Sequence, residues 1–309
     1  MSSTTFSDSA GAFRRLVFAF YKKHGRHDLP WRQTKDPYRI LVSEVMLQQT
    51  QVERVIPFYK KFVKQFPTAK SLASAPLSEV LKAWQGLGYN RRAINLQRAA
   101  RIVVGELGGV FPSDVDGLER LPGVGPYTAR AVASIAYRTP VGAVDTNVRR
   151  VLGRVLSGDQ RGLTVRELQD AADELVDREQ PDGWTHALMD IGSTLCKPAR
   201  PLCADCPVVS FCRYAAGERP APRAGRATGR RSAGSAAGDF ATTTRWLRGR
   251  ILDRLRDAPG EAWTGFAEPI GEHGAAAVET SLRAMARDGL VELRIDADRP
   301  AVLARLPIA

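Results

Sequence analysis

Apolar residues recur at the spacing of an α-helix through most of residues 12–215, and no stretch there alternates apolar and polar residues as a strand would. The segment PYRILVSEVMLQQTQVERVIPFYKKFVKQF shows this spacing, and RRAINLQRAARIVVGELGG repeats it before ending on two glycines, which favour a helix C-terminus. A chain patterned in this way buries its apolar residues by packing helix against helix. The sequence therefore predicts an all-α body.

The composition changes after residue 215. The segment ERPAPRAGRATGRRSAGSAAG contains small residues, proline and arginine, which cannot build a core, so we expect a flexible basic linker over 216–240. Beyond it, a helix over 275–287 and a hairpin of 291–295 with 301–305 resemble a helix followed by a two-stranded wing. We therefore predict a helical body over 1–215 and a small winged-helix-like α+β domain over 241–309; another small α+β module is the alternative.

The net charge of +12 indicates a polyanionic partner, nucleic acid before membrane, although a general arginine bias of the C-terminal third would also produce it. The apolar run of residues 16–21 is short and flanked by charge. It therefore predicts neither a signal peptide nor a membrane span, and we expect a cytoplasmic protein.

The stretch LPGVGPYTARAVASIA, residues 121–136, places Pro-Gly-x-Gly-Pro before a helix. Gly123 and Gly125 lack Cβ atoms, so their backbone can approach a phosphate, and the helix that begins near Pro126 offers free N–H groups to an anion. This pattern is typical of helix-hairpin-helix proteins that bind DNA without regard to sequence. An ordinary turn between two helices is the alternative.

Two carboxylates stand in informative positions. Glu44 lies in an apolar helical run with Ile40, Leu41 and Leu47 as neighbours, so burial would raise its pKa and make it a proton donor near neutral pH. A surface glutamate on the polar face is the alternative. Asp145 follows an apolar run and precedes a helix, where aspartate is a favourable N-cap. A capping carboxylate held ionised by N–H groups could also face a developing cation.

All four cysteines lie in one short segment, with the spacing Cys196-x6-Cys203-x2-Cys206-x5-Cys212. In a reducing compartment such a cluster indicates metal ligands in preference to disulfides. The four thiolates could hold Zn²⁺ or a [4Fe–4S] cluster, and only one C-x-x-C pair is present, whereas zinc ribbons usually have two.

Together, SEVMLQQTQV, LPGVGPYTA, VDTNVRRV and the cysteine spacing resemble the helix-hairpin-helix DNA glycosylases with an iron–sulfur cluster, and within them the MutY-type adenine glycosylases. The resemblance covers residues 12–215. It implies a two-lobed helix-hairpin-helix body with a [4Fe–4S] loop over 196–212. It also implies a monomer that removes a mispaired base from double-stranded DNA, with adenine opposite 8-oxoguanine or guanine as the favoured substrate.

The resemblance assigns roles to matched residues. Glu44 would protonate the base, and Asp145 would stabilise the sugar cation. Tyr127 and Asn147 would orient these groups. Tyr127 stands where relatives that resemble endonuclease III have the lysine nucleophile for strand cleavage, which implies a monofunctional enzyme. The expected DNA contacts are wedge residues Gln49 and Tyr89, with Leu87 in the same GLGY segment, and the base-pocket residues Leu29, Trp31, Arg32, Val52 and His186.

Other interpretations stay open. Core packing is the alternative for Trp31 and Tyr89. His186 stands where the family commonly has Gln or Glu, Asn90 replaces a tyrosine, and the Phe-Ser-His loop that reads 8-oxoguanine is absent. A G·T or G·U mismatch thymine/uracil glycosylase on the same scaffold is therefore the alternative enzyme. A non-catalytic DNA-binding protein is the alternative from another class.

Overall fold

The computed structural model describes residues 3–218, 240–259, 262–295 and 302–308. The predicted all-α body is confirmed, since the described part of residues 12–215 contains helices and turns and no strand. Its α-helices are α1 (Ser3–His24), α2 (Pro37–Leu47), α3 (Val52–Gln65), α4 (Ala69–Ser74), α5 (Leu77–Ala83), α6 (Arg91–Gly105), α7 (Val115–Glu119), α8 (Pro126–Tyr137), α9 (Thr146–Ser157), α10 (Val165–Leu175) and α11 (Pro181–Asp190). Capping side chains fix several of the helix starts: Asp36, Thr68, Asp114, Asp145 and Thr164 each accept a hydrogen bond from a backbone N–H.

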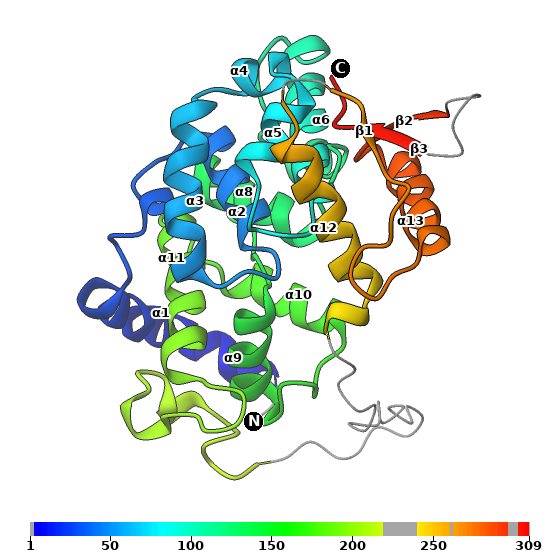
Figure 1. The fold of residues 1–309 in the computed structure, drawn as a ribbon. Helices are drawn as coiled ribbons and strands as arrows, with labels where there is room; N and C mark the ends of the chain where they lie inside the picture. The colour runs from blue at the N-terminus through cyan, green and yellow to red at the C-terminus, as the bar shows by residue number, and fades with distance from the viewer. Residues whose placement is uncertain (1–2, 219–239, 260–261, 296–301, 309) are drawn as a thin grey trace. The chain divides into compact units, whose positions relative to one another are not determined.

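The chain divides into two compact units, each built from two separate segments. Unit 1 comprises Met1–Gln48 and Val110–Gly225, and unit 2 comprises Gln49–Gly109 and Arg226–Ala309. In unit 1, α8 packs against α2 (Figure 1), and it also packs against α7. The α7–α8 pair is the helix-hairpin-helix, and Gly123 in its turn has a φ of +79°, which favours glycine.

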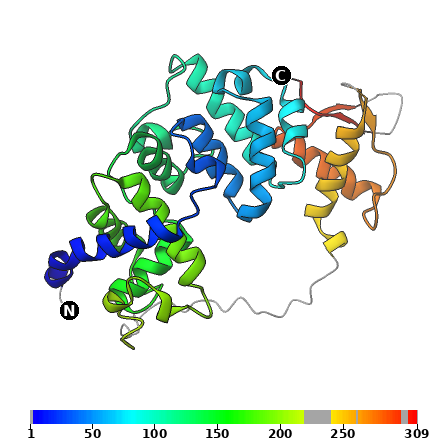
Figure 2. The same ribbon diagram turned by 90° about the vertical axis from the view of Figure 1, so that its left-hand side faces the viewer.

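The core of unit 1 joins its two segments. Phe13 and Val17 of α1 are fully buried, as is Leu152 of α9, and α1 packs along α11 (Figure 2). The ring of Phe13 lies edge-on to Trp184 of α11, with centroids 5.9 Å apart, and edge-on to Phe211 in the cysteine loop at 5.7 Å. Helix α1 therefore fixes the cysteine loop to the helices behind it.

The first segment of unit 2 is a small helical layer over α3–α6. Phe62 of α3 meets Trp84 edge-on at 5.7 Å, and α4 packs against α6. The buried Gln97 of α6 donates hydrogen bonds to the carbonyls of Leu72 and Ala75, 3.1 and 2.7 Å away, which ties the end of α4 to α6.

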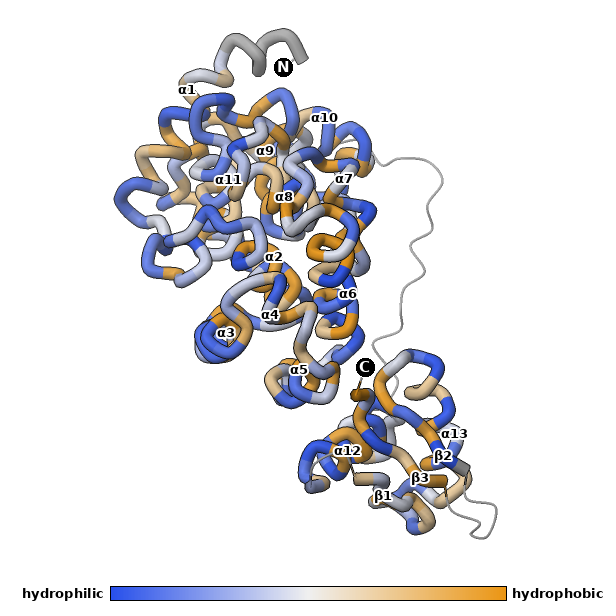
Figure 3. The backbone as a smooth tube through the Cα atoms, turned by 90° about the horizontal axis from the view of Figure 1, so that it is seen from above, coloured by the Kyte–Doolittle hydropathy of each residue, from blue (hydrophilic) through white to orange (hydrophobic). Residues whose placement is uncertain are grey.

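The second segment of unit 2 contains α12 (Thr244–Asp257), β1 (Thr264–Gly265), α13 (Ala275–Arg287), β2 (Glu292–Ile295) and β3 (Val302–Arg305). The three strands form an antiparallel sheet in the order β1-β3-β2 (Figure 3). Leu293 of β2 pairs with Ala304 of β3. The predicted helix over 275–287 is confirmed. Strand β2 begins one residue later than the strand predicted over 291–295, and β3 occupies the described part of the strand predicted over 301–305. The predicted linker lies almost entirely outside the described residues, and the winged-helix assignment of 241–309 stays a prediction.

The two segments of unit 2 contact each other at several points. The N–H of Ser78 in the first turn of α5 donates to the carbonyl of Pro307 at 2.9 Å. Arg256 of α12 donates to the side-chain oxygen of Asn90 at 3.0 Å. Residues near the end of the chain thus complete the cap of a helix in the first segment. Separately, none of the helices in the described ranges has the length and apolar character needed to cross a membrane.

Candidate active site

Glu44 lies on α2 with only 6% of its surface exposed, between the buried Ile40 and Leu41 on one side and α8 on the other. Burial raises the pKa of Glu44 to about 7, and the nearby Asp145 charge raises it as well. The hydrogen bond from Tyr127 and the charge of Arg32 act in the opposite direction. This burial excludes a surface glutamate, and the carboxyl is poised to exchange a proton near neutral pH.

Tyr127 is the second residue of α8, directly after the hairpin turn. Its hydroxyl donates a hydrogen bond of 2.8 Å to Oε2 of Glu44. Burial raises the pKa of Tyr127 well above its usual value, and both Glu44 and Asp145 add to this. The phenol therefore stays neutral and acts as a fixed hydrogen-bond donor.

Asp145 is the N-cap of α9, as predicted. Its Oδ1 accepts from the N–H of Val148 at 2.6 Å, and its Oδ2 accepts from the side-chain amide of Asn147 at 2.7 Å. Burial nevertheless raises the pKa of Asp145, and these hydrogen bonds and the charge of Arg150 only oppose that rise. Desolvation therefore outweighs the cap in its effect on the pKa of Asp145, while the cap bonds still favour the ionised form. Since Asp145 influences the pKa of both Glu44 and Tyr127, the three lie within interacting distance.

A chain of hydrogen bonds leads from Asp145 to the cysteine loop. Asn147 accepts from Nη2 of Arg150 at 2.8 Å, and the same guanidinium donates to the carbonyls of Gly192 and Cys196. Residues 191–195 form one turn of π-helix after α11, and a Cβ on Gly192 would lie 2.5 Å from Cβ of Asn147. Sequence reasoning missed Arg150 and Gly192. An arginine on the apolar face of the helix VDTNVRRVLGRVL could have indicated a buried guanidinium with polar partners.

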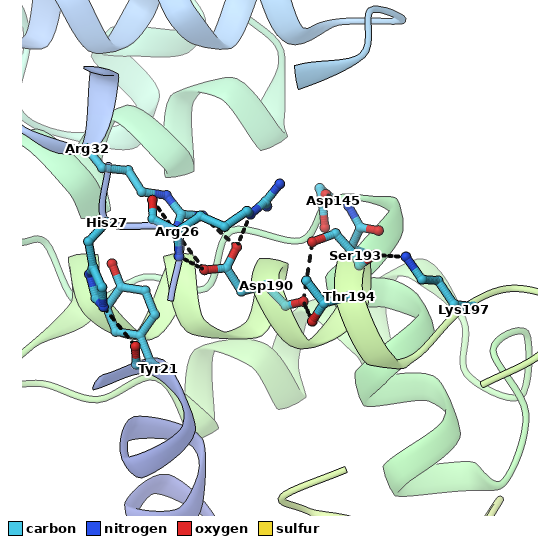
Figure 4. Close-up of polar contacts among 10 residues, drawn as sticks. Tyr21, Arg26, His27, Arg32, Asp145, Asp190, Ser193, Thr194 and Lys197 are labelled. Carbon is cyan, nitrogen blue, oxygen red and sulfur yellow. Dashed lines mark hydrogen bonds and ion pairs between the residues drawn. The ribbon is translucent and has the colours of Figure 1, made fainter. Parts of the chain in front are cut away.

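A buried ion cluster supports the other side of the site (Figure 4). The side chain of Asp190 is fully buried, and it accepts two hydrogen bonds of 2.6 and 2.9 Å from Arg32. It accepts two more from Arg26, one from the side chain at 2.7 Å and one from the backbone N–H at 3.0 Å. Burial alone would raise the pKa of Asp190, but the two arginines outweigh burial and hold it below its usual range. Sequence reasoning missed Arg26 and Asp190; an acid in the apolar run ALMDIG is the same signal that indicated Glu44.

The expected base-pocket residues of unit 1 are all inside the protein. Leu29 and Trp31 are each 5% exposed and His186 is 6% exposed. Burial lowers the pKa of His186 to about 3, and the positive charges of Arg32 and Lys35 lower it further, so its imidazole is neutral at physiological pH. The burial of Trp31 is equally compatible with core packing.

The other expected DNA contacts belong to unit 2. Gln49 and Tyr89 both have left-handed backbones, with φ of +59° and +46°, and both side chains are exposed, Tyr89 by 49%. This exposure excludes core packing for Tyr89. Leu87 is buried, and Val52 is partly buried at the start of α3.

The hairpin turn has the geometry that an anion needs. Gly125 is the N-cap of α8, and a Cβ added there would meet no atom within 4 Å. The first turn of α8 has free N–H groups beside this open space. The turn can therefore accept a phosphate close to its backbone.

The four cysteines are free thiols that line one cavity together with Arg154, Leu195 and Tyr214. Arg154 donates to Sγ of Cys196 at 3.3 Å, and its guanidinium lies 4.6 Å from the centroid of the Tyr214 ring. Burial raises the pKa of the Cys206 thiol to about 11 and also raises that of Cys212, so these two thiols need a metal to become thiolates at neutral pH. Among the described residues, no three His, Cys, Asp or Glu side chains converge on a single metal ion. Four thiols that line one cavity are the ligand set that a [4Fe–4S] cluster or a tetrahedral zinc requires.

Comparison with known proteins places this geometry in a family. The chain matches the HhH-GPD superfamily of base excision DNA repair proteins over residues 42–178, which include Glu44, Tyr127 and Asp145. It is 40% identical over 275 residues to an adenine DNA glycosylase of Mycolicibacterium smegmatis, and the match covers 88% of this chain and 90% of that relative. The chain belongs to the adenine DNA glycosylase family.

Other members of the adenine DNA glycosylase family extend the comparison. The rat relative (Rattus norvegicus) is 47% identical over 222 residues, which are 67% of this chain and 43% of that longer protein.

Among solved structures, a thermostable thymine-DNA glycosylase matches with a TM-score of 0.64 and 31% identity, over 70% of this chain and all of that one. A non-covalent endonuclease III–DNA complex matches at a TM-score of 0.57 and 26% identity, over 67% of this chain and 97% of that one.

Proposed function

We propose that the protein is a monofunctional DNA glycosylase that hydrolyses the N-glycosidic bond of adenine mispaired with 8-oxoguanine or guanine. The observation that carries this proposal is the buried Glu44, whose pKa is raised to about 7 in the immediate surroundings of Asp145 and Tyr127. The similarity to adenine DNA glycosylases along most of the chain supports adenine as the base.

The target nucleotide leaves the base stack before the reaction, because an enzyme cannot reach a glycosidic bond inside the duplex. Glu44 then donates its proton to the base, at N7 if it is adenine, and makes the base a better leaving group. A pKa of about 7 leaves much of Glu44 protonated at neutral pH. Tyr127 fixes the orientation of this carboxyl through its hydroxyl.

Departure of the base leaves positive charge on the sugar. Asp145, as its carboxylate, stabilises this charge. A water molecule then adds to the sugar as in glycoside hydrolysis, and the carboxylate that Glu44 keeps after donating its proton accepts the proton that the water loses. Asn147 and the N–H of Val148 each hold one oxygen of Asp145, so the carboxylate cannot rotate away. A phenol at position 127 cannot form an imine, so the product is an abasic site and the strand stays intact.

The DNA contacts are proposed from the same resemblance and the observed exposure. Gly123 and Gly125 of the hairpin would bind a backbone phosphate, and Gln49 and Tyr89, with Leu87 beneath them, would wedge into the duplex. Leu29, Trp31, Arg32 and His186, and Val52 of unit 2, would contact the base. The monomeric state and the cytoplasmic location stay predictions.

We propose that Cys196, Cys203, Cys206 and Cys212 hold a [4Fe–4S] cluster. The four free thiols around one cavity support this, and Arg154 supplies a hydrogen-bond donor to one of the sulfurs. When bound, the cluster supplies a rigid, covalently cross-linked loop. The purified protein should be brown and contain about four irons and four sulfides per chain; one zinc and no iron would refute the assignment.

A panel of duplexes with A·8-oxoguanine, A·G, A·C, T·G, U·G and hypoxanthine pairs, scored for abasic sites, tests the function. We expect release of adenine from A·8-oxoguanine and A·G, and none by Glu44→Gln, which should still bind DNA. The structural match to a thymine-DNA glycosylase favours T·G as the second candidate substrate. Release of thymine from T·G with no release of adenine from A·8-oxoguanine would decide for that candidate. No release of a base from any duplex would favour a non-catalytic DNA-binding protein.

A further inference from the structure

The loop of residues 86–90 in unit 2 carries Tyr89 in a conformation that a side chain of this size seldom adopts. Its φ of +46° lies in the left-handed region, and Gly86 and Gly88 on the same loop are also left-handed, at +93° and +70°. The ring is 49% exposed, so core packing does not hold it. The surrounding contacts must therefore maintain the position of this aromatic side chain.

The first segment of unit 2 holds the backbone of the loop. The indole N–H of Trp84 donates to the carbonyl of Gly88 at 3.2 Å. Nη2 of Arg92 donates to the carbonyls of Leu87 and Gly88, each at 3.1 Å, and the Arg92 guanidinium lies 5.6 Å from the centroid of the Tyr89 ring. These bonds fix the path of the chain but leave much of the ring uncovered.

The second segment of unit 2 holds the side chains of the loop. Arg245, in the first turn of α12, places its guanidinium carbon 4.6 Å from the centroid of the Tyr89 ring, closer than Arg92 does. At the other end of α12, Arg256 donates to the side-chain oxygen of Asn90. One helix of the C-terminal segment thus contacts two successive residues of the loop.

We propose that Arg245 is a positioning residue for Tyr89, through which the C-terminal segment takes part in opening the target base pair. The inference rests on the proposed function, in which Tyr89 enters the duplex beside the lesion. A planar guanidinium over the ring restricts the rotation of the side chain before DNA arrives, so less rotamer entropy is lost when the ring inserts. Because lysine lacks the planar group, it can supply the charge of this contact but not its stacking on the ring.

A double-mutant cycle tests the proposal, with Arg245→Ala, Tyr89→Ala and the double variant of the full chain. The measurements are single-turnover base release and the fluorescence of 2-aminopurine placed next to the mispair, which reports loss of stacking. Arg254→Ala is the matched control, since Arg254 is another exposed arginine on α12. Arg245→Lys separates charge from stacking, and thermal unfolding of each variant checks folding.

We expect Arg245→Ala to slow the rise of fluorescence about three- to tenfold, the range of a cation–π contact. In the Tyr89→Ala background the same change should alter the rate less than twofold, because the residue acts through the ring. Arg254→Ala should alter the rate less than twofold, and Arg245→Lys should recover less than half of the loss.

Three results would overturn the proposal: an undiminished rate for Arg245→Ala, an equal loss with and without Tyr89, or full rescue by lysine. The last two would make Arg245 an independent phosphate contact. The fluorescence signal depends on binding and opening of the duplex and needs no base release. A protein that opens A·8-oxoguanine duplexes normally but releases no adenine would therefore refute the proposed function and leave the role of Arg245 intact.

Discussion

The hydroxyl of Tyr127 donates a 2.8 Å hydrogen bond to the carboxyl of Glu44, and it opposes the rise in pKa that burial causes. The two residues come from different helices, α8 and α2, which pack against each other. The protonation state of Glu44 therefore depends on Tyr127, which does not itself ionise at physiological pH.

The rate of base release should fall as pH rises above about 7, because Glu44 with a pKa of about 7 must be protonated to act. Single-turnover rates between pH 5 and 9 measure this. Tyr127→Phe removes a hydrogen bond that lowers the pKa of Glu44. In this variant the falling limb of the pH–rate profile should therefore move to higher pH. Tyr137→Phe, on the same helix but bonded to the carbonyl of Phe111, is the control and should leave the limb in place. A shift of the Tyr127→Phe limb to lower pH would contradict the assignment.

Glu44→Gln should stabilise the protein at alkaline pH. The folded-state pKa of Glu44 is raised above its unfolded value of 4.5, so its contribution to stability is complete below pH 4.5 and is lost as pH rises through about 7. The variant lacks this loss, and its advantage in the free energy of unfolding should grow over that interval to as much as about 3 kcal/mol. Urea unfolding at pH 5 and pH 8 gives the free energies of unfolding of the variant and of the unchanged protein. An equal difference between the two proteins at both pH values would show that Glu44 is not buried as described.

Gly192→Ala should disturb the catalytic site by crowding Asn147. The new Cβ would lie 2.5 Å from Cβ of Asn147, so either the π-helical turn or Asn147 must move, and Asn147 holds Asp145. We expect a loss of about 1–3 kcal/mol in stability and at least a tenfold slower base release. Gly105→Ala is the control: nothing lies within 4 Å of its Cβ position, and it should be neutral or slightly stabilising. Normal turnover by Gly192→Ala would mean that Asn147 does not need its observed position.

Asp190→Asn should destabilise unit 1 by about 3–5 kcal/mol, because it leaves Arg32 and Arg26 without the buried charge that pairs with them. The matched exposed pair is Lys35 with Asp182, and Lys35→Ala should cost less than about 1 kcal/mol. Since the pKa of Asp190 is lowered, its contribution is present above its unfolded pKa and disappears as pH falls through its folded value. Thermal unfolding of both variants at neutral and acidic pH checks the sizes and the trend.

Sequence patterning predicted those features that depend on local order. The burial of Glu44 follows from its apolar neighbours one turn away, the cap at Asp145 from its place before a helix, and the helix over 275–287 from its periodicity. In each case the residues that produce the feature lie within a few positions of each other along the chain.

Features that depend on partners far along the chain were not predictable in this way. An acid in ALMDIG signals burial, but nothing local says that Arg32, 158 residues earlier, neutralises it. The raised pKa of Asp145 has the same origin: its cap is local, whereas the burial that outweighs the cap is set by tertiary packing. The contact between Arg245 and Tyr89 likewise joins two distant segments of unit 2.

The bond between Ser78 and Pro307 joins positions that leave the ribosome at very different times. All of α3–α6 is translated well before the carbonyl that caps α5 exists. During synthesis the first turn of α5 must therefore rely on water for that acceptor. A premature stop before position 307 would leave the Ser78 N–H of α5 permanently without this acceptor, even though every residue of the Glu44 site had been made.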